Sequence, residues 1–163
     1  MTRLLPPGLH LYDALQPGDY FDTNTAQITA AMIRTFADLT GDRFDIHISD
    51  EGAQAHGFPA QVAHGLLVLS VIEGLKASAP VQLNSFASLG WTWQFMRPVL
   101  AGDTVQCRIA LLNKRRAGPM SGLLTLQVTA RNQHGHTVQQ GETRLMVHGA
   151  VAGALMPATA FNV

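Results

Sequence analysis

The chain has 163 residues, enough for one domain, and 47% of them are hydrophobic whereas only 13% are charged. Basic and acidic residues both total 11, so the formal net charge is zero, which argues against nucleic acid as a partner because that partner requires a basic face. The single cysteine, Cys107, excludes an intrachain disulfide and a cysteine-based zinc site, and it is expected to fill core space.

Residues 1–17 are expected to form an arm, because Pro6, Pro7 and Gly8 disfavour regular structure. The same prolines break its short apolar piece and no small-residue cleavage site follows, so we expect a cytoplasmic protein without an export signal. A single domain is then predicted over 18–149, beginning with a turn and a short strand near Phe21.

A helix is predicted from about residue 30 to residue 40, since hydrophobic residues recur there at helical spacing. Thr29 is its expected N-cap, and Gly41 stands where a left-handed residue ends a helix. The recurring residues are Met32, Ile33, Phe36 and Leu39.

The next segment, 41–65, has no clean periodicity and is rich in groups that donate or accept protons. Ser49 or Asp50 is expected to cap one short helical turn that ends near Gly57. This is the part of the chain whose composition indicates a purpose other than packing.

Residues 61–78 form the stretch around which the rest is expected to fold. They predict a helix too apolar for a surface and too short and interrupted for a membrane span, so it should be covered on most sides. Its first backbone N–H groups lack partners inside the helix and carry a partial positive charge, so function is expected near its start.

After Pro80 the hydrophobic period becomes two, which predicts four long strands joined by short turns. The turns are expected at 97–103, 117–119 and 134–136. The alternating residues are Ala87, Leu89, Trp91, Trp93 and Phe95, then Val105, Cys107, Ile109 and Leu111, then Leu124, Leu126, Val128 and Ala130, then Thr143, Leu145 and Val147.

These elements predict an α+β fold in which an antiparallel sheet curls around one buried helix. The free edge of such a sheet and the low charge content favour a homodimer or higher homo-oligomer, with two sheets joined edge to edge. Residues 150–163 are small and apolar without a period and are expected to form a loosely held tail.

Asp42 and His47 are the first candidates for chemistry. Their separation in an irregular segment allows a carboxylate and an imidazole to converge on one water, which suits proton transfer near neutral pH. The alternative is ordinary turn chemistry after a helix-ending glycine and a surface histidine.

The segment FADLTGDRFDIHISDEGAQAHGFPAQVAHGLL resembles the hydratase motif of the MaoC-like dehydratases and (R)-specific enoyl-CoA hydratases, which are hot-dog folds. That motif has a helix ending in Gly-Asp, then Asn-Pro, one residue and His, and later Ala-His-Gly at the start of the central helix. The later segment FMRPVLAGDTV is similar to the family's strand-to-strand turn, so the resemblance covers roughly 18–148.

The resemblance implies a hydro-lyase that adds water across the 2,3 double bond of an enoyl-CoA thioester to give the (R)-3-hydroxyacyl-CoA. It implies Asp42 and His47 as the catalytic pair. The backbone N–H of Gly65, with the helix dipole behind it, would stabilise the developing enolate oxygen. No metal or redox cofactor is implied, and coenzyme A enters as part of the substrate.

Two predicted substrate contacts lie in the motif itself. The family's Asn-Pro is Phe44-Asp45 here, so Phe44 is a candidate for lining an acyl pocket. Asp45 either raises the pKa of Asp42 by like-charge repulsion or faces solvent, and we favour the solvent-facing position. His64, which precedes the donor glycine, is a candidate substrate contact, although we favour a structural role in which it sets the start of the helix.

The phosphates of coenzyme A would require cations, and the candidates are Arg97 and the cluster Lys114, Arg115 and Arg116. A solvated hairpin tip is the alternative for the cluster. A metal site is not expected, because His134 and His136 lack a third ligand nearby. The stripe Trp91, Trp93 and Phe95 is expected to be core or interface.

Three alternatives to a simple enoyl-CoA substrate remain. The first is a branched or dicarboxylic acyl-CoA of the mesaconyl type. The second is an acyl carrier protein thioester. The third, from another class, is a hot-dog protein that binds acyl thioesters without turning them over.

Overall fold

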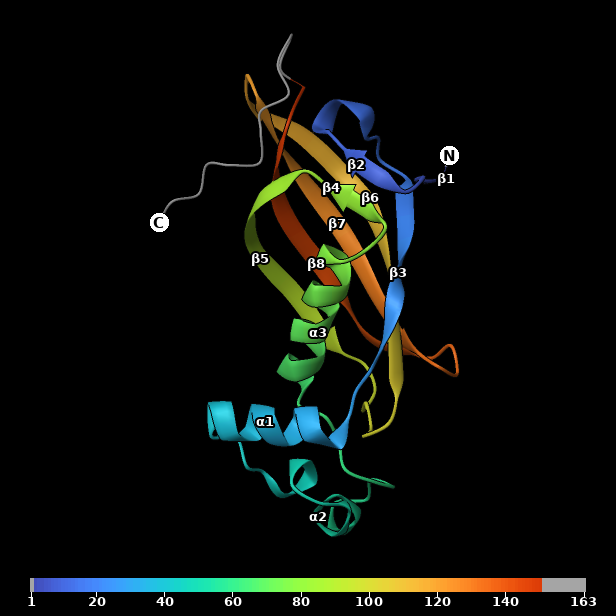
Figure 1. The fold of residues 1–163 in the computed structure, drawn as a ribbon, viewed down its shortest axis with the longest axis vertical. Coiled ribbons are helices and arrows are strands. Elements are labelled where there is room, and N and C mark those ends of the chain that lie inside the picture. Colours follow the sequence, from blue (N-terminus) through green and yellow to red (C-terminus); the bar gives the residue numbers. More distant parts are fainter. Residues whose placement is uncertain (1, 151–163) are drawn as a thin grey trace.

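The computed structural model describes residues 2–150, which form a curved sheet wrapped around helix α3 (Figure 1). The tail expected over 150–163 lies outside the described residues apart from Ala150. The helical elements are η1 (Tyr12–Ala14), α1 (Ala30–Thr40), η2 (Asp45–His47), α2 (Asp50–Ala55) and α3 (Gly65–Ala77). The strands are β1 (Arg3–Leu4), β2 (Gly8–His10), β3 (Asp19–Gln27), β4 (Val81–Leu83), β5 (Ser85–Phe95), β6 (Thr104–Gly118), β7 (Ser121–Asn132) and β8 (Thr137–His148).

The main sheet has the strand order β1-β3-β6-β7-β8-β5, and β2 pairs with β4 in a separate two-stranded ribbon. The pairs β3–β6, β6–β7, β7–β8 and β8–β5 are antiparallel, whereas β1 runs parallel to β3. The four long strands expected after Pro80 are confirmed as β5 to β8. Strands β6, β7 and β8 follow one another along the chain and also lie side by side in the sheet, as short hairpin turns require.

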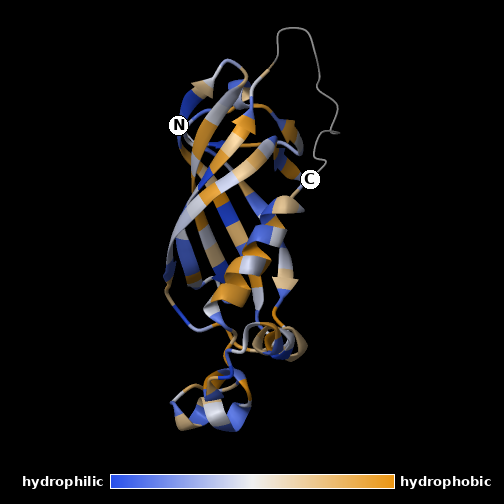
Figure 2. Ribbon diagram, turned by 90° about the vertical axis from the view of Figure 1, so that its left-hand side faces the viewer, coloured by the Kyte–Doolittle hydropathy of each residue, from blue (hydrophilic) through white to orange (hydrophobic). Residues whose placement is uncertain are grey.

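The core lies between α3 and the concave face of the sheet. Val68 and Ile72 of α3 are fully buried against inward-facing strand residues such as Val105, Cys107 and Val128. Figure 2 shows apolar and polar residues alternating along the strands, as one buried face demands. Burial raises the pKa of the Cys107 thiol to about 12, so this cysteine is an inert core residue as expected.

One flank of α3 is open, which differs from the expectation of a helix covered on most sides. Leu66 is 60% exposed, and Gly74 and Ala77 on the same helix are also exposed. A single copy of the sheet therefore covers α3 on the inner side only. Within residues 2–150, no helix is long and apolar enough to cross a bilayer.

Helix α1 confirms the predicted bounds and both predicted end residues. The Thr29 side chain accepts a hydrogen bond from the Met32 amide, and Gly41 adopts φ 78°. For α2, Ser49 rather than Asp50 is the cap, since its side chain accepts from the Gly52 amide. These ends are set by local chemistry, which explains why sequence predicts them.

Helix α3 begins at Gly65, the residue at which the resemblance places the start of the central helix, so the first four residues of the stretch 61–78 precede the helix. The preceding residues are extended, because Val62 forms an antiparallel bridge with Leu100 and the Ala63 amide donates to the Val99 carbonyl. This link to the loop between β5 and β6 is a long-range contact that helical periodicity cannot anticipate.

The expected N-terminal arm is part of the fold, which corrects the prediction for 1–17. Strands β1 and β2 each pair with another strand, and the side chains of Leu5, Tyr12 and Leu15 are buried in the core. Pro6 and Pro7 fall between the two strands, so they break the segment into short pieces without preventing pairing.

The ion pair between Arg3 and Asp19 joins β1 to β3. Burial acts to raise the pKa of Asp19, but hydrogen bonds from Arg3 and from the Gln16 amide outweigh it, so the pKa lies below its ordinary 3.8. A lowered folded-state pKa stabilises the fold above the unfolded-state pKa, and this contribution is lost as the pH falls through the folded-state value.

We therefore expect Asp19→Asn to lower the free energy of unfolding at neutral pH. The deficit relative to wild type should shrink as the pH falls below about 4, where the wild-type carboxylate is also protonated. Urea denaturation of both proteins at several pH values measures this. A deficit that stays constant down to about pH 2 would show that the charge of Asp19 is irrelevant.

Candidate active site

The loop after α1 brings Asp42 and His47 together. The Asp42 amide donates to Thr40 Oγ1 at 3.3 Å, and the Phe44 amide donates to Asp42 Oδ1 at 3.4 Å. The η2 turn then folds the chain back, so that a carboxylate oxygen of Asp42, a ring nitrogen of His47 and a ring nitrogen of His64 all lie within 4.8 Å of one another. The convergence expected of an acid and an imidazole in this segment is therefore present.

His47 is held in one orientation by the segment before α3. Its Nδ1 lies 2.7 Å from the carbonyl oxygen of Val62, and because a carbonyl only accepts, Nδ1 carries the proton. The neutral ring then presents the lone pair of Nε2, which can accept a proton. Gln61 Nε2 donates to the His47 carbonyl at 2.7 Å and fixes the backbone at the same point.

His64 lies beneath this pair as a structural link. Its side chain is 2% exposed, and its Nε2 donates to the backbone carbonyl of Asp42 at 2.9 Å. Its ring stacks on that of His47 with centroids 3.9 Å apart. His64 therefore ties the loop carrying both candidate residues to the start of α3.

Gly65 is the first residue of α3, so its N–H has no partner inside the helix. No other group within residues 2–150 accepts from it. Its carbonyl accepts from Gln139 Nε2 at 3.0 Å, and Gln139 Oε1 in turn accepts from Trp93 Nε1 at 2.9 Å. These bonds fix the position of the Gly65 carbonyl at the start of α3.

Gln139 is a site residue that the sequence did not reveal. It is only 2% exposed although it is polar, and it reaches Gly65 from β8. The one local signal was a glutamine in a strand, and nothing in the sequence places that strand opposite the start of α3.

A cavity of about 330 Å³ opens beside these groups. Phe95 forms one wall, and its ring lies so close to Gly65 that a Cβ there would be 2.7 Å from the ring. The lining residues are His47, Phe58, Val62, Ala63, Gly65, Val68, Phe95, Met96, Arg97, Pro98, Val99 and Gln139. The cavity thus joins one candidate proton-transfer group and one free backbone donor in an otherwise mainly apolar space.

Phe44 and Asp45, which stand where the related motif has Asn-Pro, lie on the outer side of the loop. Phe44 is 53% exposed and packs edge-on against His47, with ring centroids 6.5 Å apart. Asp45 is exposed, as we expected. Phe44 does not line the cavity, so its proposed contact with an acyl group stays a prediction.

The four predicted cationic contacts separate into two groups. Arg97 lines the cavity. Lys114 instead donates to the carbonyls of Tyr12 and Leu15, and Arg116 pairs with Asp13. With Arg115 they lie on the β6–β7 hairpin, which is at the opposite end of the sheet from α1 and α2 (Figure 1). Lys114 and Arg116 therefore anchor the N-terminal segment, a partner that spacing alone could not reveal.

Asp42, His47 and His64 also have the residue types of a metal site. The two imidazoles, however, stack with only 25° between their planes and 3.9 Å between their centroids. Stacked rings direct their remaining lone pairs side by side, whereas a shared ion requires them to converge. The arrangement suits proton transfer better than metal binding.

Comparison with known sequences gives a family for this geometry. The family model described as MaoC like domain matches residues 14–133. The chain is 35% identical over 104 residues to Protein MaoC of Klebsiella aerogenes, a match that covers 63% of this chain but only 31% of that protein. It is 27% identical over 142 residues to an (R)-specific enoyl-CoA hydratase of Rhodospirillum rubrum, covering 85% of this chain and 92% of that one.

Comparison with solved structures identifies the fold. A Mycobacterium tuberculosis protein described as having a double hotdog fold superposes with a TM-score of 0.75 at 20% identity, over 93% of this chain and 52% of that one. The wrapped helix is thus the central helix of a hot-dog fold, and the residues that converge at its start come from the matched segment. By fold and by sequence, the chain belongs to the family of MaoC-like domains.

Proposed function

We propose that the chain is a hydro-lyase that adds water to an enoyl thioester to give the (R)-3-hydroxyacyl thioester, or removes water from that product in the reverse direction. The observation that carries the proposal is that His47, which lies beside Asp42, borders one cavity together with Gly65, whose N–H is free. Related proteins named hydratases and dehydratases act on such thioesters, which supports the same reaction class here.

The thioester oxygen would accept a hydrogen bond from the Gly65 N–H at the positive end of α3. Addition of water at C3 turns that oxygen into an enolate, and a donor already aimed at it stabilises the charge without reorganisation. Gln139 donates to the Gly65 carbonyl and so ties β8 to the start of α3, where the donor lies.

The two protons involved would pass through the Asp42 and His47 pair. His47 Nε2 offers a lone pair, and the exposed Asp42 carboxylate can hold the attacking water beside it. Water then gives its hydroxyl to C3 and its proton to the pair, and the pair returns a proton to C2. Because the two groups are coupled, the proton transfers are assigned to the pair and not to either residue alone.

The substrate would enter as a coenzyme A thioester, and Arg97, which lines the cavity, is the candidate cation for its phosphates. No redox cofactor takes part in this scheme. A carrier-protein thioester, a branched acyl group or a dicarboxylic acyl group of the mesaconyl type would use the same pair and the same amide.

Hydration of crotonyl-CoA tests the proposal directly. The absorbance of the conjugated enoyl thioester should fall on adding wild-type protein, and chiral analysis should show the (R)-3-hydroxy product. A folded protein that binds crotonyl-CoA and longer enoyl-CoAs but hydrates none would instead establish a binding protein.

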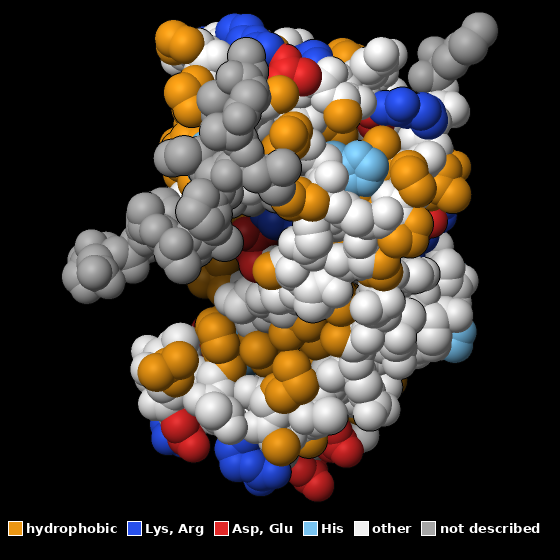
Figure 3. All heavy atoms as spheres, turned by 45° about the horizontal axis from the view of Figure 1, so that its top comes forward, with side chains coloured by type: hydrophobic (Ala, Val, Ile, Leu, Met, Phe, Trp, Pro, Cys, Tyr) orange, Lys and Arg blue, Asp and Glu red, His pale blue; other side chains and the backbone are white. Residues whose placement is uncertain are grey.

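A homodimer is the second part of the proposal. Strand β5 is the last strand of the sheet, so one of its backbone edges has no partner strand within residues 2–150. Large apolar side chains are exposed on and just after it, at Phe86, Leu89, Phe95 and Met96. Figure 3 shows hydrophobic side chains exposed across the middle of one face. An open apolar edge favours pairing with a second β5.

We expect wild type to sediment at about twice its 17.5 kDa chain mass. Leu89→Lys should shift it toward the monomer, because Leu89 lies near the middle of β5 and antiparallel pairing of two β5 strands about that point would bring the introduced charges close together. Leu112→Lys on β6 is the matched control, since Leu112 is similarly exposed (45% against 47% for Leu89) and also lies at an irregularity in its strand. Equal masses for both variants would contradict pairing through β5.

A further inference from the structure

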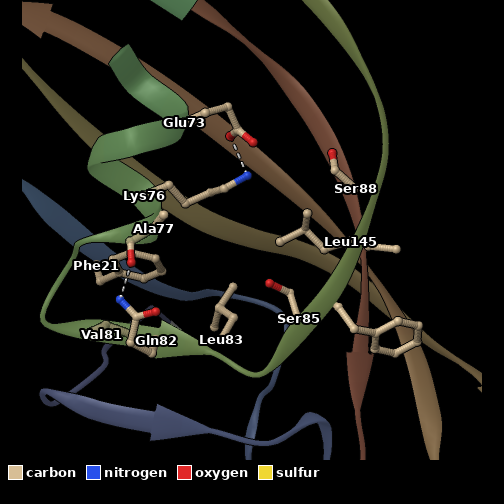
Figure 4. A pocket seen from close by; sticks show the side chains of 12 residues that line it. Phe21, Glu73, Lys76, Ala77, Val81, Gln82, Leu83, Ser85, Ser88 and Leu145 are labelled. Atoms are coloured by element: carbon tan, nitrogen blue, oxygen red, sulfur yellow. Dashed lines mark hydrogen bonds and ion pairs between the residues drawn. The ribbon is translucent and has the colours of Figure 1, made fainter. Parts of the chain in front are cut away.

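A second cavity, of about 370 Å³, lies at the far half of α3 (Figure 4). It shares no lining residue with the cavity beside His47. Its walls include apolar side chains from Phe21, Leu83 and Leu145, and polar side chains from Ser85 and Ser88. Figure 4 shows Glu73 and Lys76 projecting from α3 toward β5, with Ser88 on the opposite side.

Glu73 and Lys76 form an ion pair that leaves hydrogen-bonding capacity unused. Lys76 Nζ lies 2.5 Å from Glu73 Oε1 and 4.9 Å from the centre of the Trp91 ring. Both charged atoms are buried, and neither has a hydrogen bond to another group within residues 2–150. An ammonium has three donors, so Lys76, whose side chain is 12% exposed, keeps an unmet requirement that is costly in a buried place. The Glu73 side chain is 33% exposed, and its buried Oε1 can accept a further hydrogen bond.

The two cavities lie along one seam between α3 and β5. Phe95 at the end of β5 borders Gly65, whereas Ser85 and Ser88 near its beginning border Glu73 and Lys76. Lys76 follows Gly65 by eleven residues, which corresponds to about 16 Å along a helix. Trp91 and Trp93 pack against the core between these ends, so the seam between them is apolar.

We propose that the second cavity receives the distal end of the acyl group and selects an acyl chain that ends in a hydroxyl group. This inference rests on the proposed function, because it places the thioester at Gly65 and runs the chain along the seam. A hydroxyl can donate to Glu73 and accept from Lys76 at once, which gives the buried ammonium a second partner.

Other chain ends fit the pair less well. A methyl terminus makes neither hydrogen bond, and sites built for a hydroxyl reject analogues that lack it. A terminal carboxylate can accept from Lys76 but brings a second negative charge beside Glu73. The Glu73–Lys76 pair has no net charge, so an uncharged ligand group leaves its charge balance unchanged.

The test compares three enoyl thioesters of one length: dodecenoyl-CoA, its ω-hydroxy derivative and dodecenedioyl-CoA. Wild type should show kcat/KM at least about tenfold higher for the ω-hydroxy substrate than for either of the others. In the double variant Glu73→Leu, Lys76→Met this preference should disappear. Crotonyl-CoA should be hydrated equally by both proteins, because its short acyl group ends well before the pair.

Wild type that favours the methyl or carboxylate terminus overturns the inference, as does a preference that survives in the double variant. If crotonyl-CoA is hydrated, either result leaves the proposed function intact. If no enoyl-CoA is hydrated, calorimetry with dodecanoyl-CoA and ω-hydroxydodecanoyl-CoA decides the inference separately. A Kd about tenfold lower for the hydroxylated ligand supports it, and equal Kd values refute it.

Discussion

Replacing His47 with alanine is expected to lower kcat for crotonyl-CoA hydration by about 10²–10⁴-fold, the usual contribution of a positioned general acid or base. Asp42→Asn should cause a loss of similar size, because the amide keeps the shape of the side chain but cannot take up a proton. The double variant should be little worse than either single one, since residues that act as a unit give non-additive losses. Following the enoyl absorbance with purified variants measures all three.

Two matched controls separate chemistry from charge and folding. Asp45→Asn removes the neighbouring exposed carboxylate, and His134→Ala removes an exposed histidine from the β7–β8 turn. Both should retain kcat within about threefold of wild type. Turnover that survives in His47→Ala and in Asp42→Asn would refute the assigned pair, and a comparable loss in Asp45→Asn would extend the site to that residue.

Gly65→Ala is expected to lower kcat by about 10²-fold even though alanine retains the backbone N–H. Its Cβ would lie 2.7 Å from the Phe95 ring, so the ring must move into the cavity or α3 must shift its start. Either movement misplaces the thioester oxygen relative to the donor, and misplacement by about 1 Å costs this much. The helix itself should remain stable, since alanine favours helix more than glycine does.

Gly74→Ala is the matched control on the same helix, because a Cβ at Gly74 meets no atom within 4 Å. It should leave kcat unchanged and raise the free energy of unfolding by about 0.5–1 kcal/mol. Adding Phe95→Ala to Gly65→Ala tests the cause of the loss. Recovery of activity in that double variant would assign the loss to the displaced ring, whereas full activity in Gly65→Ala alone would remove Gly65 from the proposed site.

The secondary structure could be predicted from sequence wherever its cause is local. Thr29 and Gly41 end α1 through bonds and angles within their own turn, and the period of two after Pro80 follows from alternate residues facing one core. The pairing of Asp42 with His47 was also predictable, since both lie in one short segment whose spacing resembles a known motif. A short loop leaves few ways to arrange such neighbours.

The remainder depends on contacts between residues far apart in the chain. Pro6 and Pro7 disfavour local structure, yet β1 and β2 form because β3 and β4 offer them backbone partners. Lys114 carries a charge suited to a phosphate, but the carbonyls of Tyr12 and Leu15 take its hydrogen bonds.

The sequence by itself therefore determined the caps, the strand periodicity and the loop that holds the acid and the imidazole. Only the tertiary structure decided that Gln139 supports Gly65, that Arg97 rather than Lys114 borders the cavity, and that Glu73 and Lys76 meet in a second one. The physical reason is that local preferences act through bonds within a few residues. Which distant side chain fills a given space is fixed only when the sheet closes around α3.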